Sequence, residues 1–252
     1  MQRDATLSRT VGAAAVGLWI FMAGAACAEA ATDQVYDPWE GVNRGTYGFN
    51  TALDRRLFAP ITHGYMRAAP RPLQRGLGAV VSNFREPRTA LNDLAQGHPA
   101  LAGRTASRFA VNSTLGVLGV FDVATPMGLT WRQADFGQTL GRYGAQPGPY
   151  LMVPMIGPHN LRDAVGRVVD TLTDPLGLLI GGVSTPFGAG RLAASALDYR
   201  VDADPAMAAL DDATDPYATL RSAYAQNRAY LVGQARGETQ DLPDFDVVTD
   251  EP

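Results

Sequence analysis

Side chains that could carry out nucleophilic or acid–base chemistry are few in this sequence, and they lie far apart. The three histidines, His63, His98 and His159, have neither the His-x-x-x-His nor the His-Glu-x-x-His spacing of zinc sites. Many serine hydrolases place the nucleophile in a Gly-x-Ser-x-Gly turn, and the sequence has no such motif. We therefore predict no catalytic residues, no metal ligands and no cofactor.

The charged residues exclude further kinds of chemistry. All 21 basic residues are arginine, so the chain has no P-loop lysine, no Schiff-base lysine and no Ser-x-x-Lys nucleophile. The formal net charge is −4 at pH 7, which disfavours nucleic acid as a partner because its phosphates attract basic surfaces.

The N-terminal residues are typical of an export signal. Arg3 and Arg9 precede an uncharged run at residues 11–26, and small residues follow it, so we expect a signal peptide over residues 1–30. Two routes of processing stay open. Ordinary signal peptidase could cut after an Ala-Glu-Ala sequence, or Cys27 could be the lipidated cysteine of a lipoprotein signal. Cys27 is the only cysteine, so the mature chain has no disulfide.

The stretch from residue 135 to residue 163 stands out by its composition. Nine of its 29 residues are Gly or Pro, which excludes a long helix because Pro removes a backbone donor and Gly costs conformational entropy. Its centre is nevertheless too apolar for a solvated linker, so it is either a functional loop or a packed wall. Asn160 is placed to cap a following helix, with Asp163 completing a capping box.

Apolar residues at helical spacing, punctuated by Pro and Gly, predict a mainly α fold in which no stretch shows the alternation of a strand. We expect one helical domain over residues 36–233 and a disordered acidic tail over residues 237–252. The helices are expected over residues 43–58, 63–67, 72–86, 87–97, 101–115, 160–172 and 190–209 and from residue 216 onwards.

Two local interpretations depend on the assumption that polar side chains face water. Asn43 is expected to cap the first helix. In the helix at residues 101–115, Phe109 and Val111 are expected to face the core, and Arg104 and Arg108 the solvent.

The segments between the helices are Gly- and Pro-rich and yet apolar. Residues 116–124 and 176–188 are of this kind, and Pro126 with Gly128 resembles a hairpin tip. A soluble bundle would place polar turns between its helices, so apolar connectors favour a protein that lies in or against lipid. Aromatic residues such as Trp39 and Trp131 would then lie near the head groups, although each could equally belong to a core.

Several sequence blocks resemble one known family. DPWEGVNR at residues 37–44 is similar to the DPxEGxNR signature of the VacJ/MlaA family of phospholipid-transport lipoproteins. The resemblance extends over about residues 36–231. Further blocks in the same order are NFREP at 83–87, LNDLAQG at 91–97, RF at 108–109, NSTLG at 112–116, FDVA at 121–124, DFGQTLG at 135–141 and DPY at 215–217.

This resemblance implies a single ring-like helical domain with an amphipathic central channel, held at the inner leaflet of a Gram-negative outer membrane. Such a protein would remove mislocalised phospholipid from the outer leaflet and pass it to a periplasmic lipid carrier protein, with an outer-membrane porin trimer as partner. By position, the resemblance places the following residues at the lipid entrance and in the hairpin beside the channel: Tyr47, Phe49, Asn50, Phe121, Gly128, Leu129, Trp131 and Phe136.

Two alternatives stay open. The first is a periplasmic lipid esterase, with Ser113 or Ser195 as nucleophile and His98 or His159 as base. The second is a scaffold that organises porins without moving lipid.

Overall fold

The computed structural model describes residues 35–182 and 184–238. The signal peptide expected at residues 1–30, with Cys27, and nearly all of the acidic tail expected at 237–252 lie outside the described residues. The described part is one mainly α domain, as the sequence predicts.

The first helical segment is longer than expected because Pro60 does not interrupt it. Helix α2 (Glu40–Leu53), the π-helical turn η3 (Asp54–Phe58) and α3 (Ala59–Ala68) follow one another with helical backbone angles at both junctions. The Ala59 amide donates to the Asp54 carbonyl five residues earlier, which is the π-helical pattern. Pro60 comes directly after this widened turn and lies in the first turn of α3, where a missing donor costs little.

The next two helices form an antiparallel pair. Helix α4 (Arg71–Ala95) contains Pro87 in its interior, so the break expected there is absent. Helix α5 (Pro99–Thr114) packs along α4 and agrees with the helix expected at residues 101–115. Gly97 lies between them with a φ of 74°, a backbone conformation that Gly adopts without strain.

The Gly- and Pro-rich stretch folds into short elements. A 3₁₀ turn, η4 (Thr125–Met127), precedes α6 (Phe136–Arg142). Two strands that the sequence did not predict, β1 (Tyr150–Val153) and β2 (Gly157–Asn160), then form an antiparallel hairpin that pairs Tyr150 with Asn160 and Val153 with Gly157. The hairpin escapes sequence analysis because Pro158 and Gly157 lie within it.

The remaining chain is helical. Asn160 caps α7 (Leu161–Leu172) by accepting a hydrogen bond from the Asp163 amide, as predicted. Asp174, Thr185 and Asp215 cap the next three helices in the same way. These helices are α8 (Pro175–Ile180), α9 (Pro186–Asp211) and α10 (Pro216–Arg236).

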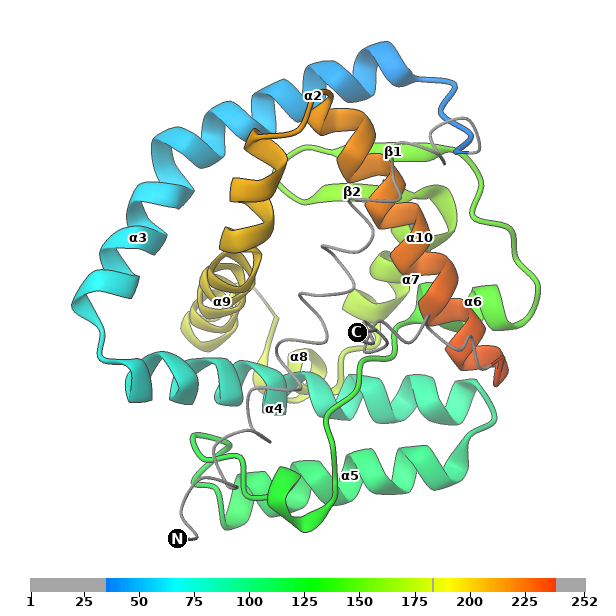
Figure 1. The fold of residues 1–252 in the computed structure, drawn as a ribbon. Coiled ribbons are helices and arrows are strands. Elements are labelled where there is room, and N and C mark those ends of the chain that lie inside the picture. The colour runs from blue at the N-terminus through cyan, green and yellow to red at the C-terminus, as the bar shows by residue number, and fades with distance from the viewer. Residues whose placement is uncertain (1–34, 183, 239–252) are drawn as a thin grey trace, which may run out of the picture.

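The elements run in a closed circuit (Figure 1). Helices α2 and α3 form an arc, α4 crosses the lower side of the view, and α6 and α10 lead back towards α2, so that the backbone forms a ring. Helix α5 lies outside this ring along α4, whereas α9 lies within the arc and packs on α3, α4 and α10.

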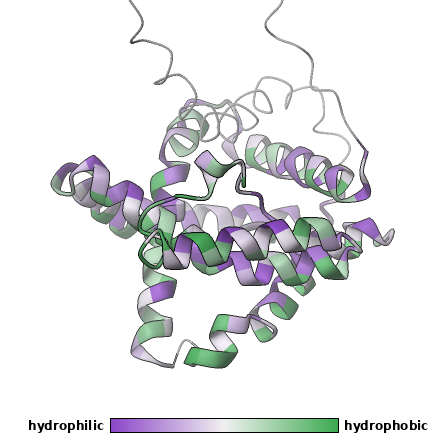
Figure 2. Ribbon diagram, turned by 90° about the horizontal axis from the view of Figure 1, so that it is seen from below, coloured by the Kyte–Doolittle hydropathy of each residue, from purple (hydrophilic) through white to green (hydrophobic). Residues whose placement is uncertain are grey.

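The distribution of polarity is inverted relative to an ordinary soluble domain. Among the described residues, 12 hydrophobic side chains are buried but 21 polar or charged ones are, while 30 large hydrophobic side chains are exposed. Charged residues are almost never fully buried in soluble proteins unless they are paired. Figure 2 shows hydrophobic and hydrophilic residues alternating along the helices, with several hydrophobic residues in the helical turns at the lower end of the view.

Helix α7 shows this inversion most clearly. Its amphipathic pattern is present as predicted, but Asp163, Gly166 and Asp170 form its buried side. Its apolar side is open, with Val168 58% and Leu172 69% exposed. A helix that turns its polar stripe inward and its apolar stripe outward is suited to a hydrocarbon environment rather than to water.

Candidate functional site

The ring is closed by arginines that bind carboxylates from other elements. Arg228 of α10 donates to both oxygens of Asp135, at 2.7 and 2.9 Å, and to both oxygens of Asp163, also at 2.7 and 2.9 Å. Burial alone would raise the pKa of Asp135, but the hydrogen bonds and charge of Arg228 outweigh it and lower that pKa. Arg228 thereby joins α10 to the start of α6 and to α7.

A second group joins α10 to the entry of α2. Asp37 accepts hydrogen bonds from Arg221 and Asn43, both at 2.8 Å, and from the Tyr217 hydroxyl. Arg44 binds Asp215 through two nitrogens, at 3.0 and 2.7 Å. Within the DPWEGVNR block, Asp37, Asn43 and Arg44 therefore have structural roles in ring closure.

The sequence suggested that Asn43 caps α2. In the structure Asn43 lies inside α2 and its side chain is buried against the strand β1. Its amide donates to the Tyr150 carbonyl at 3.0 Å and its oxygen accepts from the Met152 amide at 2.9 Å. Asn50, two turns further along α2, repeats the arrangement with the Val153 carbonyl at 3.0 Å and the Met155 amide at 2.8 Å. The two asparagines replace a missing neighbouring strand, which satisfies the edge of β1.

A third arginine group fixes the segment after α5. Arg108 is buried, contrary to the expectation that it faces solvent, and binds Glu86 at 2.7 Å and Asp122 at 3.0 Å. Its guanidinium also donates to the Leu129 carbonyl, and Arg104 donates to the Gly128 carbonyl at 3.1 Å. Burial raises the pKa of Glu86 to about 7, even though Arg108 acts in the opposite direction.

The inner side of the ring carries charges that sequence analysis missed. Tyr199 of α9 is 63% exposed, yet burial raises its pKa, and the charges acting on it are Arg167 of α7 and Arg85 of α4. The Tyr199 side chain is therefore accessible to water while lying near charges of two other helices. Helices α7 and α9 lie on opposite sides of the middle of the ring, which agrees with this placement (Figure 1).

Two carboxylates accompany Tyr199 on α9. Burial raises the pKa of Asp198 and of Asp202, and the Arg85 charge opposes both shifts. Burial also lowers the pKa of Arg85. The inner face therefore places basic groups on α4 and α7 opposite acidic groups on α9. The spacing of Asp198 and Asp202, four residues apart and hence on one side of α9, is the sequence signal that could have identified them.

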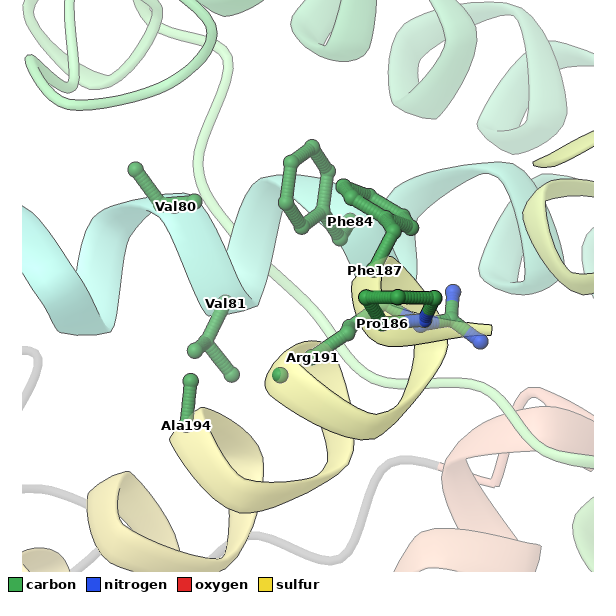
Figure 3. A pocket seen from close by; sticks show the side chains of 8 residues that line it. Val80, Val81, Phe84, Pro186, Phe187, Arg191 and Ala194 are labelled. Atoms are coloured by element: carbon green, nitrogen blue, oxygen red, sulfur yellow. The ribbon is translucent and has the colours of Figure 1, made fainter. Parts of the chain in front are cut away.

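An apolar hollow of about 240 Å³ adjoins this charged region between α4 and α9. Figure 3 shows Val80, Val81 and Phe84 from α4 beside Phe187 and Ala194 from α9. The rings of Phe84 and Phe187 pack edge to face with centroids 5.8 Å apart. The guanidinium of Arg191 points away from the apolar side chains and binds Asp174. Apolar and charged surfaces thus lie close together on the inner side of α4 and α9.

The residues placed by resemblance at the entrance and in the hairpin lie on several elements. Tyr47 packs at the aromatic core around Tyr150 and Tyr217, Asn50 binds β1, and Phe136 begins α6. Gly128 ends η4 with a φ of 84°, so the expected hairpin tip is a 3₁₀ turn. The exposed ones are Phe49, Phe121, Gly128 and Trp131, whereas Leu129 is partly buried.

The serines and histidines of the esterase alternative are not brought together by any hydrogen bond in the part of the chain that the structure describes. The Ser113 hydroxyl accepts from Asn83, and His159 contacts the Gly157 carbonyl. His98 precedes the first residue of α5 and Ser113 is near its end, so about 22 Å of helix separates them at 1.5 Å per residue.

Metal-binding clusters and membrane-spanning helices are both absent from residues 35–182 and 184–238. These residues contain no group of three or more His, Cys, Asp or Glu side chains that could hold a metal ion. No helix among them combines the length and apolarity needed to cross a bilayer.

An inside-out helical ring, apolar outside and charged inside, is typical of a domain that contacts lipid. The sequence matches the family described as MlaA lipoprotein over residues 35–231. The chain belongs to this family.

Relatives and a solved structure agree with that assignment. The intermembrane phospholipid transport system lipoprotein MlaA of Escherichia coli (strain K12) is 30% identical over 231 residues, covering 89% of this chain and 90% of that protein. An uncharacterized protein of Rickettsia felis is 36% identical over 196 residues, 77% of each chain. A structure described as "Structural basis for maintenance of bacterial outer membrane lipid asymmetry" matches with a TM-score of 0.69 at 32% identity, covering 78% of this chain and 98% of that chain.

Proposed function

We propose that this chain is the outer-membrane component of an intermembrane phospholipid transport system. It takes phospholipid misplaced in the outer leaflet and passes it to a periplasmic carrier protein, which maintains lipid asymmetry. The relative from Escherichia coli, which this chain matches over most of its length, is named as a lipoprotein of such a system.

The observation that carries the proposal is the inverted polarity of the ring. Apolar side chains are exposed on helix faces such as that of α7, while charged groups of α4 and α7 act on the exposed Tyr199 of α9. A phospholipid needs both kinds of surface, because its head group requires polar contacts and each methylene of its tails costs about 0.8 kcal/mol in water. A ring embedded in one leaflet would give the head group a polar path.

In this proposal the chain lowers a barrier and makes or breaks no covalent bond. The direction of transport would then be imposed by the partners that receive the lipid, since the sequence has no nucleotide-binding motif. The partners we propose are a periplasmic carrier and an outer-membrane porin trimer, whose apolar wall would fit the exposed hydrophobic helices.

Membrane attachment would combine these helices with a lipid anchor on Cys27. One acyl signal alone gives marginal membrane binding, so the exposed side chains of α7 and α8 would supply the second contribution. In Cys27→Ala, full membrane association and full rescue of function would contradict the anchor and favour removal of Cys27 with the signal.

The function is tested by measuring phospholipid in the outer leaflet of a deletion strain, with a surface-acting lipid-modifying enzyme as probe. Surface phospholipid should rise on deletion and fall again with the wild-type gene. Ala196→Trp places a bulky side chain on the exposed inner stripe of α9 between Leu192 and Tyr199, and it should fail to restore asymmetry at normal abundance. Ala106→Trp, on the exposed side of α5, which lies outside the ring (Figure 1), is the matched control and should rescue.

The outcomes separate the alternatives. No change of surface phospholipid on deletion would refute the transport function. Full rescue by Ala196→Trp would refute the inner path and favour a scaffold that organises porins. Release of fatty acid from phospholipid by the purified chain would favour the esterase.

A further inference from the structure

The geometry of α4 and α9 places their opposite charges close together. The two helices run antiparallel, because Gly78 adjoins Asp198 whereas Phe84 adjoins Phe187. A Cβ atom added to Gly78 would lie 2.7 Å from the Asp198 carboxylate, so this carboxylate rests directly against α4. Arg85 lies seven residues beyond Gly78, on nearly the same side of the helix, and arginine side chains lean towards the helix N-terminus. Arg85 therefore extends in the direction of Asp198.

Within the described part of the chain, the charges of Arg85, Asp198 and Asp202 are not neutralised by ion pairs. Arg85, Asp198 and Asp202 form no ion pair within 4.0 Å with another described residue. The carboxylates of Asp135 and Asp163 are different, because both are held by Arg228. Surrounding a charge with protein costs free energy unless it is paired, and burial shifts the pKa values of all three inner groups towards the neutral form.

The arrangement on the inner face has the polarity of a zwitterion. One wall presents guanidinium groups, Arg85 from α4 and Arg167 from α7, and the other presents the two carboxylates of α9. A guanidinium binds phosphate oxygens well, and a carboxylate pair suits an ammonium group that donates hydrogen bonds. The apolar hollow at Phe84 and Phe187 lies beside this site and could accommodate part of an acyl chain.

We propose that Arg85 binds the phosphate, and Asp198 with Asp202 the ammonium group, of a zwitterionic phospholipid head group inside the ring. The site thereby selects zwitterionic over anionic phospholipid. This inference rests on the proposed transport function, and it names the lipid class that the inner path accepts. An anionic head group lacking an ammonium group would leave both carboxylates unpaired and facing its own negative charge, and specificity arises from such repulsion as much as from attraction.

The test uses the full-length chain purified in detergent and equilibrated with vesicles of equimolar phosphatidylethanolamine and phosphatidylglycerol. The bound lipid is extracted after re-isolation of the protein and quantified by mass spectrometry. The variant Asp198→Asn/Asp202→Asn is compared with Asp211→Asn/Asp212→Asn. The control also removes two negative charges, but at the C-terminal end of α9, where Asp211 forms only a solvent-exposed pair with Arg55.

Wild type should hold phosphatidylethanolamine in about fivefold excess over phosphatidylglycerol. Asp198→Asn/Asp202→Asn should bring this ratio to about one or below, while the control keeps the wild-type ratio. Arg85→Gln should reduce the total amount of both lipids, because both contain the phosphate that Arg85 binds. Circular dichroism melts report whether each variant is folded. If the double variant unfolds, the single change Asp202→Asn at an exposed position replaces it, and this change should lower the lipid ratio partway.

Two failures can be told apart. If wild type binds phospholipid without preference, or if Asp202→Asn and the double variant leave the ratio unchanged, the head-group inference is wrong while transport stands. If wild type binds no phospholipid and the deletion strain keeps its lipid asymmetry, the proposed function itself fails.

Discussion

Replacing Arg228 by Met tests whether buried ion pairs hold the ring together. The Arg228 guanidinium makes four hydrogen bonds of 2.7 to 2.9 Å to Asp135 and Asp163. Its removal leaves the largely buried Asp135 without an ion-pair partner among the described residues, whereas Asp163 keeps Arg162 at 2.9 Å. Removing one partner of a buried ion pair costs about 3–5 kcal/mol. The methionine retains most of the side-chain volume, so the loss should be electrostatic rather than a cavity effect.

The thermal midpoint measured by circular dichroism in detergent should fall accordingly. For a domain of this size each kcal/mol corresponds to about 2–4 °C, so Arg228→Met should lower Tm by roughly 6–20 °C at pH 7.5. The control is Arg55→Met, which breaks a pair with Asp211 whose side chains are 64% and 58% exposed, and Tm should not change measurably.

The pH dependence distinguishes an ionic role from general disruption. In wild type the pKa of Asp135 is lowered, because Arg228 outweighs the effect of burial, so its stabilisation is present above the unfolded pKa of about 3.9 and lost below it. Without Arg228, the burial that raises that pKa is opposed only by the hydrogen bond from the Gln138 amide and by the charge of Arg88. We therefore expect the pKa to rise, so that the variant gains stability as the pH falls and Asp135 becomes neutral. The Tm difference should therefore shrink between pH 7.5 and pH 5. A Tm within about 2 °C of wild type at pH 7.5, or a difference that does not shrink, would refute this reasoning.

Three further perturbations test other parts of the domain. Burial raises the pKa of Glu86 to about 7, so stability should fall by up to about 1.4 kcal/mol per pH unit as the pH rises from 5 to 7, and Glu86→Gln should lack this slope in Tm-against-pH curves. Gly166→Ala places a Cβ atom 2.3 Å from the Gly137 nitrogen and should lower the free energy of unfolding by about 1–3 kcal/mol, measured in thermal melts. The control Gly103→Ala has open space around it and should stabilise α5 by about 0.5–1 kcal/mol. Equal effects of the two variants would contradict the close α6–α7 contact. Leu179 is 82% exposed on α8, and Leu179→Asp should weaken sedimentation with vesicles without changing Tm, so unchanged sedimentation would exclude α8 from lipid contact.

Local signals predicted those features of the fold that depend on neighbouring residues. The cap at Asn160, the helix at residues 101–115 and the start of the last helix at Pro216 follow from capping chemistry and Pro placement alone. The helix break predicted at Pro87 is absent, because α4 continues through this residue while packed between α5 and α9. The β1–β2 hairpin was missed because α2 asparagines, distant in sequence, complete its hydrogen bonding.

Side-chain orientation could not be predicted from a pattern that presumes water outside. Arg108 was expected to face the solvent, and it is buried against Glu86. A signal was nonetheless present in α4, where the polar residues recur at helical spacing and form the buried face. These are Asn83, Glu86, Thr89, Asn92 and Asp93.

The polar core follows from the apolar exterior. When lipid covers the outside of a helix ring, the hydrophobic effect no longer drives its helices together, since lipid tails are as apolar as leucine. Cohesion must then come from close packing and from polar contacts between elements, and a rigid, planar guanidinium can bind two carboxylates at once. Arg228 joins α10 to α6 and α7, Arg108 joins α5 to α4, and Arg200 joins α9 to η3 through Asp54. Among the described residues, Arg85, Asp198 and Asp202 form no ion pair and so do not follow this rule. A cost that contributes nothing to cohesion is expected where a ligand supplies the missing partners.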